Sequence, residues 1–134
     1  MVIDTSAIFA AIAGEPDSPA YREAIKAAPV RLLSAVTMLE ARIVLFARLG
    51  PAAIAIFDEL IAQAEIAVVP FDTALADAAF EAFRRYGKGQ GSPAQLNFVD
   101  CIGYALARSR GLPLLYKGAD FAQTDIRSAL PGGE

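Results

Sequence analysis

Four acidic residues occupy positions that suit chemistry: Asp4, Glu40, Asp100 and Asp120. Two of them follow apolar runs that predict strands, and the other two lie in apolar stretches that predict helices. A carboxylate in apolar surroundings must be paired, neutral or bound to metal. Hard oxygen ligands of this kind suit Mg²⁺, or alternatively Mn²⁺. Such a site supports phosphodiester hydrolysis, in which metal activates water and steadies the leaving oxygen.

The two acids that follow strands also have structural interpretations. Asp4 would cap the helix that begins after it, a role that is compatible with metal binding. Asp120 follows the run Pro113-Leu-Leu-Tyr-Lys-Gly, and taken alone it would be a solvated turn residue. Asp125 is a similar but weaker candidate for the same site.

The two acids in helices are less easily explained as surface residues. Glu40 has apolar neighbours three and four positions away, which predicts that it lies on an apolar face. The alternative is that it reaches solvent or pairs with Arg42. Asp100 suits the first turn of its helix, but Asn97 is the better N-cap and leaves Asp100 less needed there.

Composition excludes several classes of site. Histidine is absent and Cys101 is the only cysteine. These counts exclude an internal disulfide, a cysteine-based zinc site, a Ser-His-Asp triad and a Cys-His pair. The net charge of −3 argues weakly against a nucleic-acid partner, although a carboxylate cluster would be counted in that total.

The hydropathy of the chain bears on membranes and partners. Hydrophobic residues make up 55% of the sequence, yet no stretch reaches the ~18 uncharged apolar residues that a membrane span needs. The first residues lack the basic region and cleavage site of a signal peptide. We therefore expect no membrane association and a cytoplasmic location, with apolar surface left for a partner.

The order of predicted elements indicates the fold class. Four strands are predicted, at Met1–Asp4, Arg31–Ser34, Ile66–Val69 and Pro113–Tyr116, with an edge strand at Ile126–Ser128. Helices are predicted at Ser6–Ala13, Ser18–Ala28, Val36–Leu49, Pro51–Ala64, Thr73–Tyr86 and Asn97–Arg110. This alternation is typical of a three-layer α/β/α fold with a mostly parallel sheet, in which ligands bind outside the carboxyl ends of the strands. We expect one domain over residues 1–130 and a frayed tail over residues 131–134.

Several motifs together resemble the PIN-domain ribonucleases of the VapC toxin family. They are Val2-Ile-Asp-Thr-Ser-Ala, Glu40 in its helix, Leu96-Asn-Phe-Val-Asp-Cys, and Leu114-Leu-Tyr-Lys-Gly-Ala-Asp-Phe-Ala-Gln-Thr-Asp-Ile. The resemblance implies a PIN-like fold and a metal pocket made of Asp4, Glu40, Asp100 and Asp120. Thr5 and Ser6 would lie beside that pocket, and Asn97 would support it. Ala119 stands where the family often has a further acid, which bears on metal affinity.

The resemblance also implies a function and partners. The chain would be a metal-dependent endoribonuclease, the toxin of a type II toxin–antitoxin pair, cleaving structured RNA such as transfer RNA at a single-stranded loop. A VapB-like antitoxin would place a peptide in an apolar groove, with a basic side chain reaching the acids. The apolar helices in the range Val36–Ala64 also suggest a homodimer.

Basic residues near the third and fourth acids are candidates for RNA contact. Arg85, Lys88 and Lys117 would meet the phosphate backbone, and Tyr86 would stack on an unpaired base. The alternative is an ordinary helix end followed by a glycine-rich loop.

Two other functions remain open. One is a non-catalytic PIN-like module that binds RNA or a protein. The other is an Asp-based phosphotransfer domain, which is disfavoured because Ser6 stands where the second acid of such phosphatases is expected.

Overall fold

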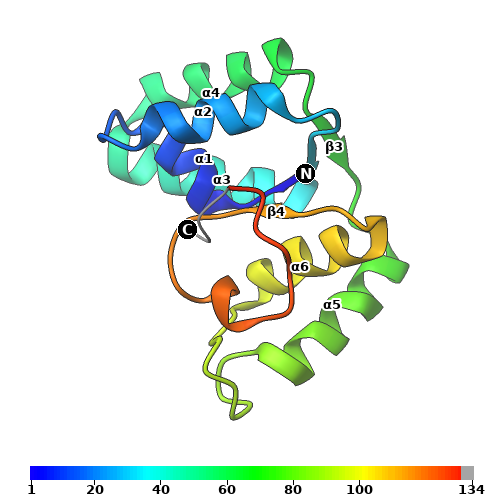
Figure 1. Ribbon diagram of the computed structural model, residues 1–134. Helices are drawn as coiled ribbons and strands as arrows, with labels where there is room; N and C mark the ends of the chain where they lie inside the picture. The colour runs from blue at the N-terminus through cyan, green and yellow to red at the C-terminus, as the bar shows by residue number, and fades with distance from the viewer. Residues whose placement is uncertain (131–134) are drawn as a thin grey trace.

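A parallel four-stranded sheet lies between two layers of helices (Figure 1). The computed structural model describes residues 1–130. The tail expected at residues 131–134 lies outside the described residues. Within that range the structure has the predicted three-layer α/β/α arrangement, and all of the strand pairs are parallel.

The four strands are short and fall inside the predicted ranges. They are β1 (Val2–Ile3), β2 (Leu32–Ser34), β3 (Ala67–Val69) and β4 (Leu114–Leu115). Their order in the sheet is β3-β2-β1-β4. In the register of the sheet, Val2 pairs with Leu32 on one side and with Leu114 on the other.

The edge strand expected at Ile126–Ser128 is wrong. This segment makes a single bridge between Leu114 and Ser128, with the Leu114 amide donating to the Arg127 carbonyl at 2.9 Å. The Ser128 hydroxyl instead accepts from the Leu130 amide at 3.2 Å and donates to the Leu130 carbonyl at 3.1 Å. Local side-chain bonds of this kind compete with a ladder and turn the backbone away from it.

Six helices and one 3₁₀ turn surround the sheet. They are α1 (Thr5–Ile12), α2 (Ser18–Ala27), α3 (Ala35–Leu49), α4 (Pro51–Gln63), α5 (Thr73–Tyr86), α6 (Phe98–Arg110) and η1 (Phe121–Gln123). Each predicted helix is present, with ends that match the expected ones or differ from them by one residue.

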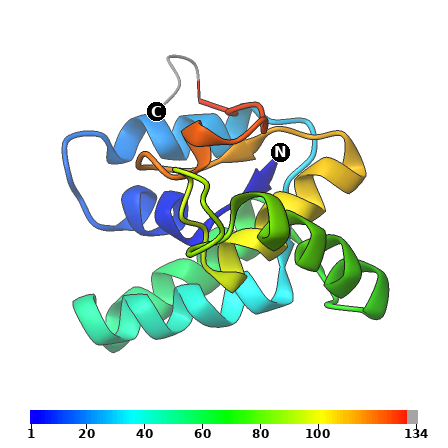
Figure 2. The ribbon, with the colours of Figure 1, turned by 90° about the horizontal axis from the view of Figure 1, so that it is seen from below.

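Alternating side chains of the strands fill two separate cores. Val2, Leu32 and Leu114 point to one face and pack with α5 and α6. Their neighbours Ile3, Leu33 and Leu115 point to the other face and pack with α1 to α4. Successive residues of a strand face opposite sides, so both faces must be apolar when helices cover both. Seen from below, α5 lies in front of α6 (Figure 2).

The topology determines where a ligand site can form. The chain passes from β1 to β2 and β3 on one side, and then returns to place β4 on the other side of β1. A crevice forms outside the carboxyl ends of strands at such a reversal. Asp4 directly follows β1, and Lys117 and Asp120 come shortly after β4.

Some large apolar side chains remain exposed. Leu39, Ile43 and Phe46 on α3 are 57%, 59% and 60% exposed and lie on one face by their spacing. Phe80 on α5 and Phe98 on α6 are exposed too. Over residues 1–130 no helix has the length and apolar character needed to cross a membrane.

Candidate active site

Asp4 is a buried acid with one oxygen bonded and one oxygen free. It is 4% exposed and caps α1, its Oδ2 accepting from the Ser6 amide at 3.0 Å and the Ser6 hydroxyl at 2.5 Å. Its Oδ1 is buried and has no hydrogen-bond partner within the described residues. The capping interpretation is therefore confirmed, and it leaves one oxygen for a ligand.

The two hydroxyl residues after Asp4 connect it to other elements. The Ser6 hydroxyl accepts from the Lys117 amide at 3.0 Å, which ties α1 to the segment after β4. The Thr5 hydroxyl donates to Glu40 Oε1 at 2.5 Å. Thr5 and Ser6 thus lie beside the acids, in the place that the sequence predicts for them.

Glu40 points toward Asp4 and away from the base proposed as its alternative partner. Arg42 pairs with Asp58 on α4 at 3.0 Å, so the pairing of Glu40 with Arg42 is wrong. The expectation of an apolar face around Glu40 is only partly correct, because Ile43 is 59% exposed. Val44 lines the same pocket as Glu40.

Asp100 has a capping role that the sequence argument assigned to Asn97 alone. Asn97 does cap α6, its side chain accepting from the Asp100 amide at 2.8 Å. Asp100 returns the contact, accepting from the Asn97 amide at 3.0 Å, and the two form a capping box. Asn97 is the N-cap as expected, and Asp100 contributes more to the helix start than expected, since a polar residue at the third helical position can reach back to the N-cap amide.

Burial and neighbouring negative charges raise the pKa of two acids of the pocket, Asp100 and Asp4. The pKa of Asp100 rises to about 7, mainly because burial disfavours the charged form and then because Asp4, Glu40 and Asp120 are also negative. Burial likewise raises the pKa of Asp4, and the charge of Glu40 adds to the effect against the opposing Ser6 hydrogen bonds. Within residues 1–130 no lysine or arginine forms an ion pair with Asp4, Glu40 or Asp100, so a bound cation would relieve their repulsion.

Asp120 lies at the edge of this arrangement. It is exposed, precedes η1 and is not among the residues that line the pocket, although its charge acts on Asp100. Within residues 1–130, no three of the acids stand close enough to form a ready-made metal site. The acids still fit a hard cation by their chemistry and by the unpartnered oxygen of Asp4.

The acids open into a cavity of about 440 Å³. It is lined by Asp4, Thr5, Ser6, Phe9, Glu15, Glu40, Val44, Arg48, Asp100 and Lys117. Four of these lining residues were not predicted for the site from the sequence: Phe9, Glu15, Val44 and Arg48. Their spacing could have revealed two of them, because Val44 and Arg48 follow Glu40 at intervals of four on one helix face. The Arg48 guanidinium lies 4.2 Å from the centre of the Phe9 ring.

Only one of the three basic residues predicted to meet RNA lines the cavity. Lys117 does so, and its ammonium lies 2.6 Å from Asp17 Oδ2 and 3.6 Å from Glu15 Oε1. Lys88 is exposed in the loop after α5. Arg85 is engaged elsewhere, donating to the Tyr86 hydroxyl at 2.9 Å.

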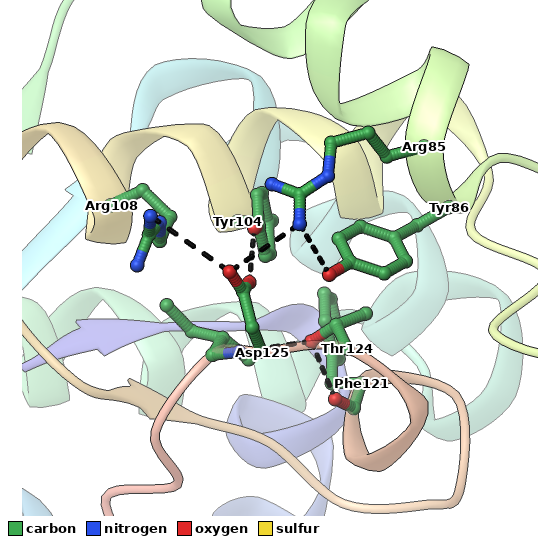
Figure 3. A network of polar contacts seen from close by, with 8 residues as sticks. Arg85, Tyr86, Tyr104, Arg108, Phe121, Thr124 and Asp125 are labelled. Atoms are coloured by element: carbon green, nitrogen blue, oxygen red, sulfur yellow. Dashed lines mark hydrogen bonds and ion pairs between the residues drawn. The ribbon is translucent and has the colours of Figure 1, made fainter.

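Asp125 belongs to a separate cluster (Figure 3). It accepts a hydrogen bond from Tyr104 and lies near Arg85 and Arg108. The Tyr104 hydrogen bond, and then the two arginines, lower the pKa of Asp125. The rings of Tyr86 and Tyr104 pack edge to face with 5.5 Å between centroids, and stacking of Tyr86 on an unpaired base stays a prediction.

Comparison with known proteins places this site in a family. Residues 1–127 match the PIN domain family. Ribonuclease VapC28 of Mycobacterium tuberculosis is 46% identical over 130 residues, covering 97% of this chain and 98% of that protein. Ribonuclease VapC of Mycolicibacterium smegmatis is 44% identical over 126 residues, covering 94% and 97%. The chain belongs to the VapC family of PIN-domain ribonucleases.

A solved VapC structure shares the fold. It is Mycobacterium tuberculosis VapC20, described as a sarcin-ricin loop cleaving toxin, with a TM-score of 0.78, 22% identity and coverage of 97% and 98% of the two chains. The predicted PIN-like fold and the resemblance to VapC toxins are therefore confirmed.

Proposed function

We propose that this VapC-family protein is a metal-dependent endoribonuclease, the toxin of a type II toxin–antitoxin pair. The observation that carries the proposal is the buried, unpartnered Oδ1 of Asp4 in a cavity shared with Glu40 and Asp100. A buried acid surrounded by other acids is costly unless a cation or a proton joins it.

The metal would be Mg²⁺, or alternatively Mn²⁺. Asp4, Glu40 and Asp100 would hold it, with Asp120 approaching from the edge of the cavity. When bound, such an ion activates water and stabilises the leaving oxygen of a phosphodiester.

The other residues near the acids orient them. Ser6 fixes one oxygen of Asp4 and so leaves the second oxygen directed to the ligand. Thr5 holds Glu40, and Asn97 holds Asp100 through the capping box. Histidine is absent, so proton transfer falls to carboxylates or to solvent.

The substrate that we propose is structured RNA cut at a single-stranded loop, with transfer RNA as one target. Splayed bases enter a narrow acidic cavity more easily than a duplex does. Lys117 and Arg48 line the cavity and would meet the phosphates there, and Lys88 in the glycine-rich loop after α5 would meet the backbone further along. A substrate of this kind places the activity in the cytoplasm.

We propose two protein partners, a VapB-like antitoxin and a second copy of the chain. The exposed Leu39, Ile43 and Phe46 on α3 support a contact surface. An apolar hollow lined by Phe71, Phe80 and Phe98, among others, supports a second one. Light scattering of the pure protein tests the dimer, and co-purification with the product of the adjacent gene tests the antitoxin.

An RNA cleavage assay tests the enzymatic proposal directly. The pure protein should cut total RNA with Mg²⁺ or Mn²⁺ and should stop in EDTA, with Asp4→Asn as the inactive control. Cleavage that persists undiminished in EDTA would contradict the metal requirement. RNA binding without cleavage by the wild type would favour the non-catalytic module, and transfer of phosphate from acetyl phosphate to Asp4 would favour the phosphotransfer domain.

A further inference from the structure

A polar cluster centred on Asp125 joins residues 118–127, the C-terminal segment, to α5 and α6 (Figure 3). Tyr104 donates its hydroxyl hydrogen to Asp125 Oδ1. Asp125 Oδ2 lies 3.6 Å from Arg85 Nη2 and 3.8 Å from Arg108 Nη2. Side chains from two helices therefore converge on one carboxylate of the segment.

The same segment and the same helix also carry two of the pocket acids. Tyr104 follows Asp100 by four residues on α6, so the two side chains lie one turn apart on one side of the helix. Asp120 and Asp125 flank η1 at its two ends. The segment thus faces α6 twice, once where Asp120 acts on Asp100 and once where Asp125 meets Tyr104.

Asp120 has little anchoring of its own. Its side chain is exposed and makes no capping hydrogen bond to η1. Phe121, next to Asp120, is buried in the core cluster that includes Tyr104 of α6, with 5.3 Å between its ring centroid and that of Tyr116. Within residues 1–130, the polar side-chain contacts from residues 118–127 to α5 and α6 all go through Asp125.

We propose that Asp125 is a positioning residue for Asp120. Its contacts hold the segment against α6 and so fix the distance between the Asp120 and Asp100 carboxylates. This inference rests on the proposed metal-dependent function and deepens it. It says what keeps the most exposed of the four acids within reach of the cavity.

The test compares metal binding in variants of the cluster, without RNA. Tyr104→Phe removes only the hydroxyl, and Asp125→Asn keeps an acceptor but removes the charge. Asp58→Asn is the matched control, since it breaks the Asp58–Arg42 ion pair between α3 and α4, far from the segment in sequence. Mn²⁺ binding is measured by electron paramagnetic resonance, and amide hydrogen exchange is measured over residues 117–124.

Both cluster variants should bind Mn²⁺ roughly 10-fold more weakly, as expected when a group that orients a ligand is lost. They should also exchange the amides of residues 117–124 faster than the wild type. The double variant should bind about as weakly as the weaker single variant, because both changes break one contact. Asp58→Asn should leave Mn²⁺ binding and this exchange unchanged.

Two results would overturn the inference, and they differ in what they say of the proposed function. If both variants melt earlier but bind Mn²⁺ as the wild type does, Asp125 only stabilises the fold and the proposed function stands. If the wild type binds no Mn²⁺, the proposed function fails as well. Circular dichroism verifies folding, and the exposed position of Asp125 keeps Asp125→Asn usable should Tyr104→Phe not fold.

Discussion

Two groups of carboxylates in this protein have opposite surroundings. In the cavity, Asp4 and Asp100 face other acids, and burial raises the pKa of both. In the C-terminal cluster, Asp125 faces a hydroxyl and two arginines, and its pKa is lowered. Within residues 1–130 the acids of the first group form no ion pair, whereas Asp125 in the second group is paired with arginines of the chain itself. All three residues are aspartates, so the groups around each carboxylate, and not the residue type, distinguish a candidate ligand site from a structural contact.

The largest effect expected from this contrast is on activity. Asp4→Asn keeps the shape and a capping oxygen but removes a charge from the acidic group, so it should abolish RNA cleavage. The metal-free variant should be as stable as the wild type or more so, by roughly 0.5–2 kcal/mol at neutral pH. Thermal melts with EDTA and with Mg²⁺ measure this, and the Mg²⁺ stabilisation should be reduced. A destabilised variant that responds fully to Mg²⁺ would remove Asp4 from the metal site.

The pH dependence of stability should follow the raised pKa of Asp100. Unfolded, this acid ionises near its ordinary pKa of 3.8, whereas in the folded protein its pKa is about 7. Between these values the unfolded chain releases a proton that the folded chain keeps. The metal-free protein should therefore lose about 3 kcal/mol of stability as pH rises from about 4 to about 7. Urea unfolding across this range checks the loss, and saturating Mg²⁺ should restore part of it. A flat profile would mean that the pKa of Asp100 is not raised in the folded protein.

Removing the acid of the C-terminal cluster should lower the stability of the metal-free protein, whereas removing the charge of Asp4 should not. Asp125→Ala removes a hydrogen bond and two ion-pair contacts and leaves the Tyr104 hydroxyl without its partner. The metal-free protein should lose about 1 kcal/mol of stability at neutral pH, where Asp4→Asn gains it. Urea unfolding of both variants in EDTA compares the two signs directly. Equal signs would show that the two groups of acids do not differ as described.

The smallest expected effect is on substrate binding and concerns Arg48, whose guanidinium lies over the Phe9 ring. Arg48 lines the cavity, and no ion pair to it is found within residues 1–130. If it contacts RNA in both the ground and transition states, Arg48→Ala should raise KM roughly 3–10-fold and leave kcat unchanged. Arg110→Ala, at the far end of α6, is the control with the same loss of charge. An equal rise of KM in both variants would indicate only long-range electrostatics.

The sequence predicts well what depends on local pattern. The four strands are predicted because they are apolar runs, and three of them, β1, β2 and β4, are buried on both faces. Asp4 and Lys117 follow from the strand ends. The capping box of Asp100 could have been predicted from its spacing to Asn97.

Contacts between distant segments could not be predicted in this way. Arg85 pairs with Asp125, which lies forty residues later in the chain. The sequence around Arg85 does not show whether its side chain is paired or free to contact RNA. The exposure of Asp120 depends on how the segment after β4 turns, which the packing of Phe121 determines. The strand expected at Ile126–Ser128 has the right composition, but the hydroxyl of Ser128 bonds locally instead.

The buried thiol of α6 does not line the acidic cavity, because Cys101 lines the separate apolar hollow of Phe71, Phe80 and Phe98. Cys101 follows Asp100, and burial, followed by the Asp100 charge, raises the pKa of its thiol to about 11. At cellular pH it therefore stays protonated and offers no thiolate, and the chain has no imidazole to add. Zinc and copper bind more tightly than magnesium mainly where sulfur and nitrogen ligands are present, so their higher affinity should be reduced at a site made of carboxylates. The abundance of magnesium in the cell can then decide which ion is loaded.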